Sequence, residues 1–248
     1  MKKTEPTNFR KCLDAISYHH DTRKVFDAFC RLSACALSLE TREAEYMEEV
    51  KRWKKEELQH FAEGLGALVN EMQTKPFEDV LGGYYMEFAI STSTQQRGGE
   101  FHTPKHICEL MARMTMQWEN LPQDGVITVC EPCCGAGAMI LAIGECATPE
   151  QRRRLRVTAI DISRTACDMC YINTTLWGIP CQIFHGNTIS QEFWASWKNL
   201  HWLMPWLPLT MTAPKTPDGM NFDLPPQGDK PEAEIVKQLT NAVQMQLV

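Results

Sequence analysis

The sequence predicts an α/β protein in which a parallel sheet follows a lobe made only of helices. Three short apolar runs in the middle of the chain each end in a glycine or a polar residue, and helical patterns separate them. Alternating strands and helices are typical of a parallel sheet with right-handed crossovers. Before residue 77 the apolar residues recur at helical spacings, which indicates an all-helical beginning. A chain of 248 residues is long enough for one sizeable core and a smaller lobe.

The expected helical lobe covers residues 1–90. Residues 9–40 carry an apolar stripe on one helical face, and a second stripe covers residues 42–72. Such a stripe most simply packs into a core, and a partner-binding surface is the alternative. Pro76 ends the second helix because proline cannot continue its hydrogen-bond ladder. A further short helix is expected over residues 77–88.

The sheet is expected within residues 91–211. A helix from about 105 to 118 should precede it, with Thr103 as its cap and Pro104 at its first position. After that helix we expect, in chain order, a strand at 126–129, a helix that includes Met139 and Ile143, a strand at 156–160, a helix at 163–177 and a strand at 182–185.

The pattern becomes irregular beyond Ser190. Four tryptophans lie within residues 194–206. Five prolines lie within residues 212–231, which indicates a loop or flexible tail over residues 212–248. The last part of this tail, residues 232–247, is amphipathic and is compatible with a terminal helix.

Composition and charge restrict the classes of function. The chain is 44% hydrophobic and 23% charged, as expected of a globular rather than a disordered protein. It has no apolar run of about 18 residues and no signal-peptide pattern at its start, so we expect a cytoplasmic protein without a membrane anchor. Its eleven cysteines are then expected to be free thiols in a reducing compartment.

The most informative stretch is V-I-T-V-C-E-P-C-C-G-A-G, from Val126 to Gly137. A buried strand that ends in glycines and opens a helix is where an α/β sheet binds a nucleotide-like ligand. Small residues there let the ligand approach the backbone. Asp161 ends the next strand, where a carboxylate can accept hydrogen bonds from both hydroxyls of a ribose. Alternatively, Asp161 only caps the helix that begins near Ser163.

Three motifs resemble those of a known family. Glu131-Pro132, two small residues and Gly135-Ala136-Gly137 resemble motif I of the adenine-N6 DNA methyltransferases, which bind S-adenosylmethionine. The turn G-E-F-H-T-P over residues 99–104 resembles the G-x-F-x-T-P turn in the modification subunits of type I restriction systems. His185-Gly186-Asn187-Thr188 resembles the third-strand motif of the same family.

The resemblance covers residues 77–190. It implies a Rossmann-like S-adenosylmethionine-dependent methyltransferase fold over residues 91–211, with the N-terminal helical lobe before it. The cofactor would be S-adenosyl-L-methionine, with its ammonium group near Glu131, directly or through water. Asn187 would bind the adenine, or would serve only a turn. The full expected cofactor-binding set is Phe101, Thr103, Pro104, Glu131, Pro132, Gly135, Gly137, Asp161 and Asn187.

The catalytic tetrad of that family, Asn or Asp followed by Pro, Pro and an aromatic residue, has no intact counterpart. Residues Asp223-Leu224-Pro225-Pro226 have the acid and the prolines but lack the aromatic platform for a flipped base. Asp223 is therefore the candidate catalytic residue. The net charge is −6 and no segment is left over to read DNA sequence. We therefore expect DNA binding to need a specificity subunit or another partner.

Three functions stay open at this point. The first is an S-adenosylmethionine-dependent DNA methyltransferase, specific for adenine N6 and weak or inactive alone. The second is a catalytically inactive cofactor-binding subunit or regulator, which the incomplete tetrad favours. The third is a methyltransferase that acts on a small molecule or a protein.

Two further patterns have competing interpretations. Cys130-x-x-Cys133 and Cys167-x-x-Cys170 suggest zinc, but the 33 residues between the pairs exceed the spacing of common zinc ribbons. We therefore expect no metal. The basic group of Arg152, Arg153 and Arg154, with Arg156 beyond it, is expected to be a solvated loop between a helix and a strand. A phosphate contact is the alternative.

Overall fold

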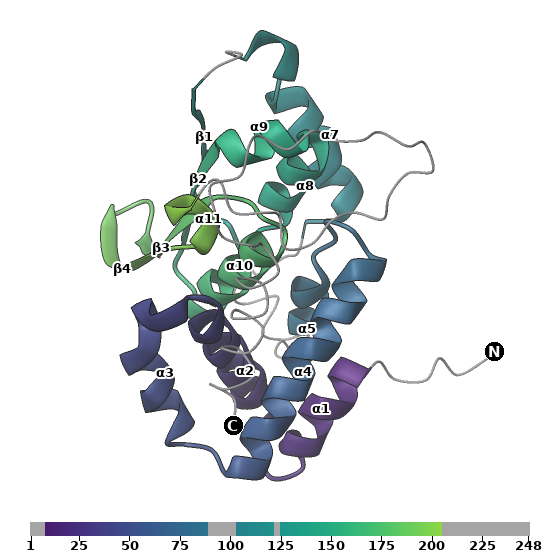
Figure 1. Cartoon of the computed structure of the whole chain (residues 1–248), viewed down its shortest axis with the longest axis vertical. Helices are drawn as coiled ribbons and strands as arrows, with labels where there is room; N and C mark the ends of the chain where they lie inside the picture. The colour runs from purple at the N-terminus through teal and green to yellow at the C-terminus, as the bar shows by residue number, and fades with distance from the viewer. Residues whose placement is uncertain (1–7, 89–102, 122–124, 205–248) are drawn as a thin grey trace, which may run out of the picture.

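Helices come first along the chain, and alternating strands and helices follow (Figure 1). The computed structural model describes residues 8–88, 103–121 and 125–204. Its N-terminal helices are α1 (Asn8–Ser17), α2 (Thr22–Leu37), the 3-10 helix η1 (Leu39–Arg42), α3 (Glu43–Val50), α4 (Lys55–Thr74) and α5 (Val80–Phe88). The remaining elements are α7 (Lys105–Thr115), the 3-10 helix η2 (Trp118–Asn120), β1 (Ile127–Glu131), α8 (Ala138–Cys146), α9 (Pro149–Arg154), β2 (Leu155–Asp161), α10 (Arg164–Leu176), β3 (Cys181–Asn187), β4 (Glu192–Lys198) and α11 (Leu200–Leu203).

The four described strands form one sheet in the order β1-β2-β3-β4. As the sequence predicts, β1, β2 and β3 run parallel, with Ile127 beside Leu155 and Val157 beside Cys181. The antiparallel strand β4 was not predicted. It lies in the tryptophan-rich stretch, and its exposed Phe193 obscures the alternation that usually indicates a strand.

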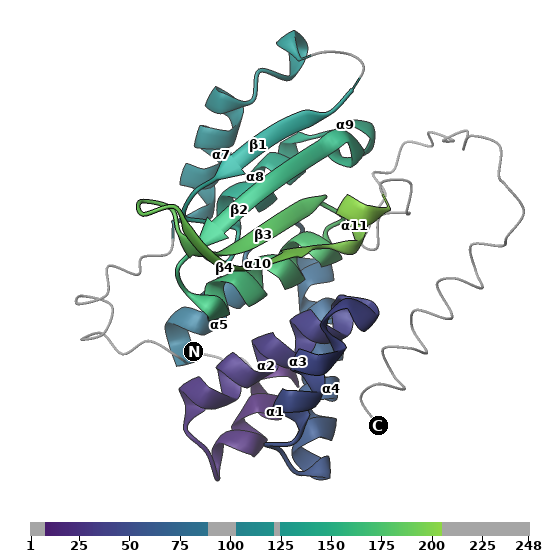
Figure 2. The same cartoon turned by 90° about the vertical axis from the view of Figure 1, so that its left-hand side faces the viewer.

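Helices cover one face of the sheet. Figure 2 shows the strands from the other side, with α8 and α10 behind them. The side chains that face these helices are buried, and the alternate side chains on the opposite face are half-buried or exposed. The helix-facing set includes Leu155, Val157, Ala159, Cys181 and Ile183, and the opposite set includes Thr128, Cys130, Arg156, Thr158, Gln182 and Phe184.

Each of the two long predicted helices is interrupted. Residues 9–40 form α1 and α2, because the side chain of Asp21 accepts a hydrogen bond from a backbone N–H and starts a new helix. Residues 42–72 form α3 and α4, and at the start of α4 the Glu57 carboxylate accepts the Lys54 N–H at 2.8 Å. Both stripes are core, as expected, and contribute Val25, Phe29, Leu32, Phe61, Leu65, Leu68 and Met72.

Arg152 is buried, so the expected solvated loop is wrong at this position. Its side chain lies on α9 with only 7% of the residue exposed. Its Nε donates to the Gly144 carbonyl at 2.9 Å, and its guanidinium lies 4.5 Å from the ring centre of Phe77. Burial lowers the pKa of Arg152 to about 10. This arginine therefore caps the carboxyl end of α8 by binding its backbone carbonyls, and it does not face solvent or phosphate.

A buried carboxylate on α10 holds the N-terminal helices against the sheet region. Asp168 is 1% exposed. Its Oδ2 accepts from Arg31 Nε of α2 at 2.7 Å, and its Oδ1 accepts from Arg42 Nη2 of η1 at 2.8 Å. Arg164, one turn earlier on α10, lies 3.4 Å away. One negative charge is thus shared by three guanidinium groups.

Glu45 of α3 completes this network. It pairs with Arg42 at 2.7 Å and with Arg164. Burial by itself raises the pKa of Glu45, but the hydrogen bonds and charges of the two arginines lower it to about 2. Both guanidinium groups lie over the ring of Trp197 on β4, at 4.6 Å and 4.1 Å from its centre. The network therefore joins η1, α3, α10 and β4.

None of the helices that the structure describes combines the length and the hydropathy that a membrane span requires.

Replacing Asp168 with Asn removes the shared negative charge with almost no change of shape. We expect the free energy of unfolding to fall by about 3–5 kcal/mol, because guanidinium groups stay buried without their counter-charge. Urea unfolding followed by circular dichroism measures the change. The matched control is Asp14→Asn, since Asp14 pairs with Arg10 on the surface. This substitution should change the free energy of unfolding by less than about 0.5 kcal/mol. Equal effects of the two substitutions would contradict the prediction.

Candidate cofactor site

The loop from Glu131 to Gly137 joins the carboxyl end of β1 to α8. Gly135 has φ +53° and Gly137 has φ +93°, a left-handed backbone that suits glycine. A Cβ at Gly137 would lie 3.2 Å from Cys170 Sγ, whereas a Cβ at Gly135 would meet no atom within 4 Å. Gly137 therefore lets α8 pack closely on α10, and Gly135 turns the chain beside open space.

Asp161 lies beside this loop at the end of β2. Its Oδ2 accepts the N–H of Gly135 at 2.8 Å, and its Oδ1 accepts the N–H of Ser163 at 2.8 Å. The carboxylate thus holds both the glycine loop and the turn into α10. An ionised carboxylate has about four acceptor sites, so these two bonds leave capacity for two ribose hydroxyls.

Glu131 is the last residue of β1 and is half-buried. Its Oε1 accepts the N–H of Cys133 at 3.3 Å. Burial raises the pKa of Glu131, and the negative charge of Asp161 raises it further. Two carboxylates that converge on one loop favour a cationic ligand.

The β3–β4 hairpin reaches the same loop. Thr188 Oγ1 donates to the Pro132 carbonyl at 2.6 Å. Asn187 Oδ1 accepts the backbone N–H groups of Ile189 at 2.9 Å and Ser190 at 3.3 Å. The side-chain oxygen of Asn187 therefore closes the hairpin turn, which matches the turn alternative.

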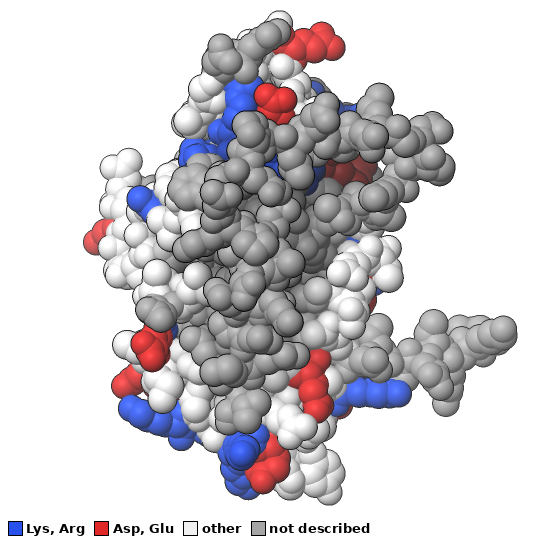
Figure 3. Space-filling view, in the orientation of Figure 1, with Lys and Arg blue, Asp and Glu red and all other residues white. Residues whose placement is uncertain are grey.

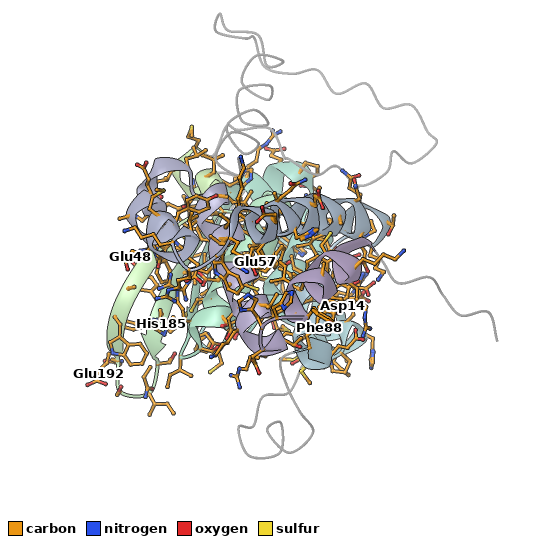
Figure 4. The ribbon with its side chains drawn as sticks, turned by 90° about the horizontal axis from the view of Figure 1, so that it is seen from below. Asp14, Glu48, Glu57, Phe88, His185 and Glu192 are labelled. Atoms are coloured by element: carbon orange, nitrogen blue, oxygen red, sulfur yellow. The ribbon has the colours of Figure 1, made fainter. Side chains whose placement is uncertain are left out.

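Aromatic rings lie along this hairpin. His185 and Trp194 have ring centres 4.8 Å apart, and Trp194 is 55% exposed. Figure 4 shows His185 and Glu192 together on one side of the molecule, far from Phe88 of α5. Burial lowers the pKa of His185, so its ring is neutral at pH 7. The hairpin thus offers a neutral, partly exposed stacking surface.

The side chains of Asn173 and Asp79 support this loop through hydrogen bonds. The sequence patterns did not indicate this role for either residue. Asn173 of α10 is fully buried; its Nδ2 donates to the Ala136 carbonyl at 2.8 Å and to Asp79 Oδ1 at 3.0 Å. Asp79 Oδ1 also accepts the Gly82 N–H of α5 at 2.8 Å. These bonds join the N-terminal helices to the middle of the loop. The sequence feature that could have indicated Asn173 is its place on an apolar helix face, because a buried amide needs hydrogen-bond partners.

The predicted turn before α7 is only partly described. Phe101 lies outside the described residues, as does the candidate catalytic residue Asp223. Pro104 is the N-cap of α7, so the expected cap by Thr103 is wrong. The Pro104 carbonyl accepts the backbone N–H of Ile107 at 2.9 Å and starts the helix.

A cavity of about 200 Å³ lies beside the first turns of α8. Thr103 lines it together with Ala138, Ala142 and Glu145 of α8. Its charged lining consists of Glu78, Asp79, Lys105 and Glu145, and Lys105 Nζ lies 3.4 Å from Glu145 Oε1. Of the predicted set, the structure thus brings together Glu131, Pro132, Gly135, Gly137 and Asp161, with Asn187 at the hairpin.

The paired cysteines do not form a four-ligand site. Cys130 and Cys133 are exposed, whereas Cys167 and Cys170 are buried, and none of the eleven cysteines forms a disulfide. Within residues 8–88, 103–121 and 125–204 no three His, Cys, Asp or Glu side chains are grouped to hold a metal. A hydrogen bond with Cys170 and burial raise the pKa of Cys134. The buried Cys134 thiol therefore stays protonated and packs within the loop as a small apolar group.

Substituting Gly137 with Ala is expected to destabilise the protein by about 1–3 kcal/mol, because the backbone is left-handed there and the methyl group would press on Cys170. Thermal unfolding measures this loss. The control is Gly66→Ala in α4, where a Cβ meets nothing within 4 Å and where Ala should stabilise by about 0.5–1 kcal/mol. A neutral effect of Gly137→Ala would show that the loop does not need this conformation.

Comparison with known proteins agrees with these motifs. The Type I restriction enzyme MpnII methylase subunit of Mycoplasma pneumoniae (strain ATCC 29342 / M129 / Subtype 1) is 29% identical over 136 residues, which are 51% of this chain and 24% of that relative. This chain therefore spans about a quarter of the length of that relative. No solved structure matches the chain. The sequence model described as N-6 DNA Methylase matches residues 77–222, and the chain belongs to that family.

Proposed function

We propose that this chain binds S-adenosylmethionine and serves a DNA methyltransferase that acts on adenine N6. The observation that carries the proposal is the Asp161 carboxylate bonded to the Gly135 N–H, with Glu131 beside it. These groups lie at the carboxyl ends of two adjacent parallel strands, where α/β sheets bind nucleotide-like ligands. The proposed fold is accordingly Rossmann-like.

Each part of the cofactor has a complementary group in this arrangement. The two ribose hydroxyls fit the remaining acceptor sites of Asp161. The ammonium and sulfonium groups are cations, and the charges of Glu131 and Asp161 attract them in a partly dry cleft. The open space at Gly135 admits the ligand to the backbone. The amide nitrogen of Asn187 is the group that would donate to the adenine.

DNA as the substrate and adenine as the target are inferred from the family and from the relative. We propose that a partner subunit supplies much of the DNA contact. The chain has a net charge of −6. Figure 3 shows one face of the molecule, on which the described basic side chains lie in small groups with acidic side chains near them. Phosphate contacts carry much of the affinity for DNA, so a basic partner would be required.

A catalytically inactive cofactor-binding subunit is the second candidate function. Its support is the sequence Asp223-Leu224-Pro225-Pro226, which holds the only two consecutive prolines of the chain and has no aromatic residue after them. Without that ring a flipped adenine loses its stacking platform, worth about 1–3 kcal/mol per base.

Calorimetry should show that the unchanged protein binds S-adenosylmethionine and that Asp161→Asn binds it about 10- to 100-fold more weakly, because a charged hydrogen-bond acceptor for the ribose is lost. Thermal unfolding of both proteins checks that the variant is folded. A 2′,3′-dideoxy analogue is the matched ligand, and the substitution should weaken its binding much less, because only the attraction of the Asp161 charge to the cationic groups is lost. Absence of binding by the unchanged protein at millimolar cofactor would end the proposal.

Alone, the chain is expected to methylate DNA weakly or not at all. To test this, the chain is expressed in a bacterium that lacks DNA methylation, and the genome is then sequenced to detect N6-methyladenine. Any residual methylation should disappear in Asp223→Ala, because that carboxylate is the only candidate acceptor for the adenine amino group. Robust methylation that survives Asp223→Ala would place catalysis elsewhere, in the tryptophan-rich segment 194–206.

A further inference from the structure

The face of the sheet opposite to α8 and α10 is polar and carries positive charge. Its polar residues follow from the alternation of side chains along the strands, and they are Thr128, Arg156, Thr158, Gln182, Ser196 and Lys198. The acidic residues of the described strands, Glu131, Asp161 and Glu192, belong to the alternate set. In a chain with a net charge of −6, a face of this kind favours an anionic partner.

Two sequence features that the proposed function leaves unexplained meet on this face. Arg156 belongs to the basic group after α8, and Trp202 belongs to the tryptophan-rich stretch. The Arg156 guanidinium lies 5.8 Å from the centre of the Trp202 ring, and Lys198 Nζ lies 5.7 Å from it. A tryptophan ring attracts cations within about 6 Å of its centre. One ring thus keeps two positive charges close together.

These two charges lack a counter-charge within the described part of the chain. No described carboxylate forms an ion pair with Arg156 or Lys198. Nη1 of Arg156 donates to the carbonyls of Arg153 at 3.0 Å and Leu155 at 2.6 Å. A guanidinium has five N–H donors, so others are left for a ligand. Burial lowers the pKa of Arg156, and a bound phosphate would supply the missing negative charge.

A buried asparagine fixes the position of Trp202. Asn199 is fully buried. Its Oδ1 accepts the backbone N–H of Trp202 at 3.0 Å and that of Cys181 at 3.1 Å, and its Nδ2 donates to the Ile179 carbonyl at 2.7 Å. These bonds tie α11 to the first residue of β3, as Figure 2 shows. The ring beside the two cations is therefore held in place before a ligand arrives, which reduces the entropy cost of binding.

An exposed aromatic ring lies toward the other end of the same face. Phe193 is 48% exposed, and its ring centre lies 5.4 Å from that of Phe184. It pairs with Gly186 across the hairpin. Lys198 follows five positions later on β4, which corresponds to about 17 Å along a strand. Cations for phosphates together with an exposed ring for a base are how proteins bind single-stranded nucleic acids.

We propose that this face of the sheet binds a single-stranded nucleic acid, with phosphates at Arg156 and Lys198 and a base stacked on Phe193. The side chains of Gln182 and Ser196 lie between these points and can form hydrogen bonds with sugars and bases. A duplex fits less well, because its bases stack on one another and leave no free face for Phe193. The inference goes beyond the proposed function, since none of these residues belongs to the expected cofactor-binding set.

Fluorescence anisotropy with a labelled oligothymidylate tests the inference on the full chain without cofactor. Lys198→Gln should weaken binding about fivefold or more at about 50 mM salt, and should lower the slope of log affinity against log salt by about 0.7, because one phosphate contact is lost. The matched control is Lys11→Gln on α1, which removes the same charge from another exposed position. It should leave the affinity and the slope unchanged.

A second substitution tests the stacking. Phe193→Leu keeps an apolar side chain but removes the ring, so binding should weaken about fivefold or more while the salt slope stays the same. Circular dichroism checks that each variant is folded. Oligouridylate, measured in parallel, distinguishes RNA from DNA, and binding of either one supports the inference.

Four results would overturn the inference. The first is no binding of either oligonucleotide at low salt, and the second is an equal loss in Lys11→Gln and Lys198→Gln. The third is a duplex that binds as tightly as the single strand. The fourth is a change of oligomeric state in Lys198→Gln without nucleic acid, measured by analytical ultracentrifugation, since that would assign the face to a second copy of the chain.

Discussion

The buried charge of Asp168 is the constraint on which the arrangement of this protein depends. A carboxylate taken out of water needs close counter-charges, and here they come from Arg31 and Arg42, 137 and 126 positions away in the sequence. Apolar stripes alone would let helices slide over one another. Directional bonds to one carboxylate hold α2 and η1 at a single position on α10, and the ring of Trp197 on β4 packs against the Arg42 guanidinium. We infer that this network sets how the N-terminal helices meet the sheet.

The same helix carries that constraint to the candidate site. On α10, Cys170 lies against Gly137, and Asn173 bonds to the carbonyl of Ala136. Asp79 links this asparagine to α5. The N-terminal helices are therefore part of the support of the glycine loop. Buried bonds of this kind keep a loop in its binding geometry before the ligand arrives, which reduces the entropy cost of binding.

The described residues form the proposed site on the β2 side of β1 more fully than on its opposite side. The ends of β1 and β2 supply both carboxylates and the glycine loop, whereas the far side of β1 has no described strand. The sequence motifs show a similar imbalance. The resemblance to the methylase family is strong at the cofactor loop and weak at the tetrad near Asp223. The relative is also much longer than the match. Cofactor recognition and base recognition are thus separable questions for this chain.

Local patterns in the sequence were enough to identify the parallel β-α-β-α-β order, the glycine loop and the carboxylate of Asp161, because alternation, helical spacing and glycine conformation are properties of neighbouring residues. They were also enough to indicate the family, which the comparison confirmed. Local patterns did not reveal β4, whose exposed aromatic residues break the alternation, or the buried role of Arg152. The sequence by itself thus determined the three parallel strands and the loop that forms the candidate site. Only the tertiary structure decided which groups support that site, because Asp168 and Asn173 bind partners that are far away in the chain and leave no periodic signal.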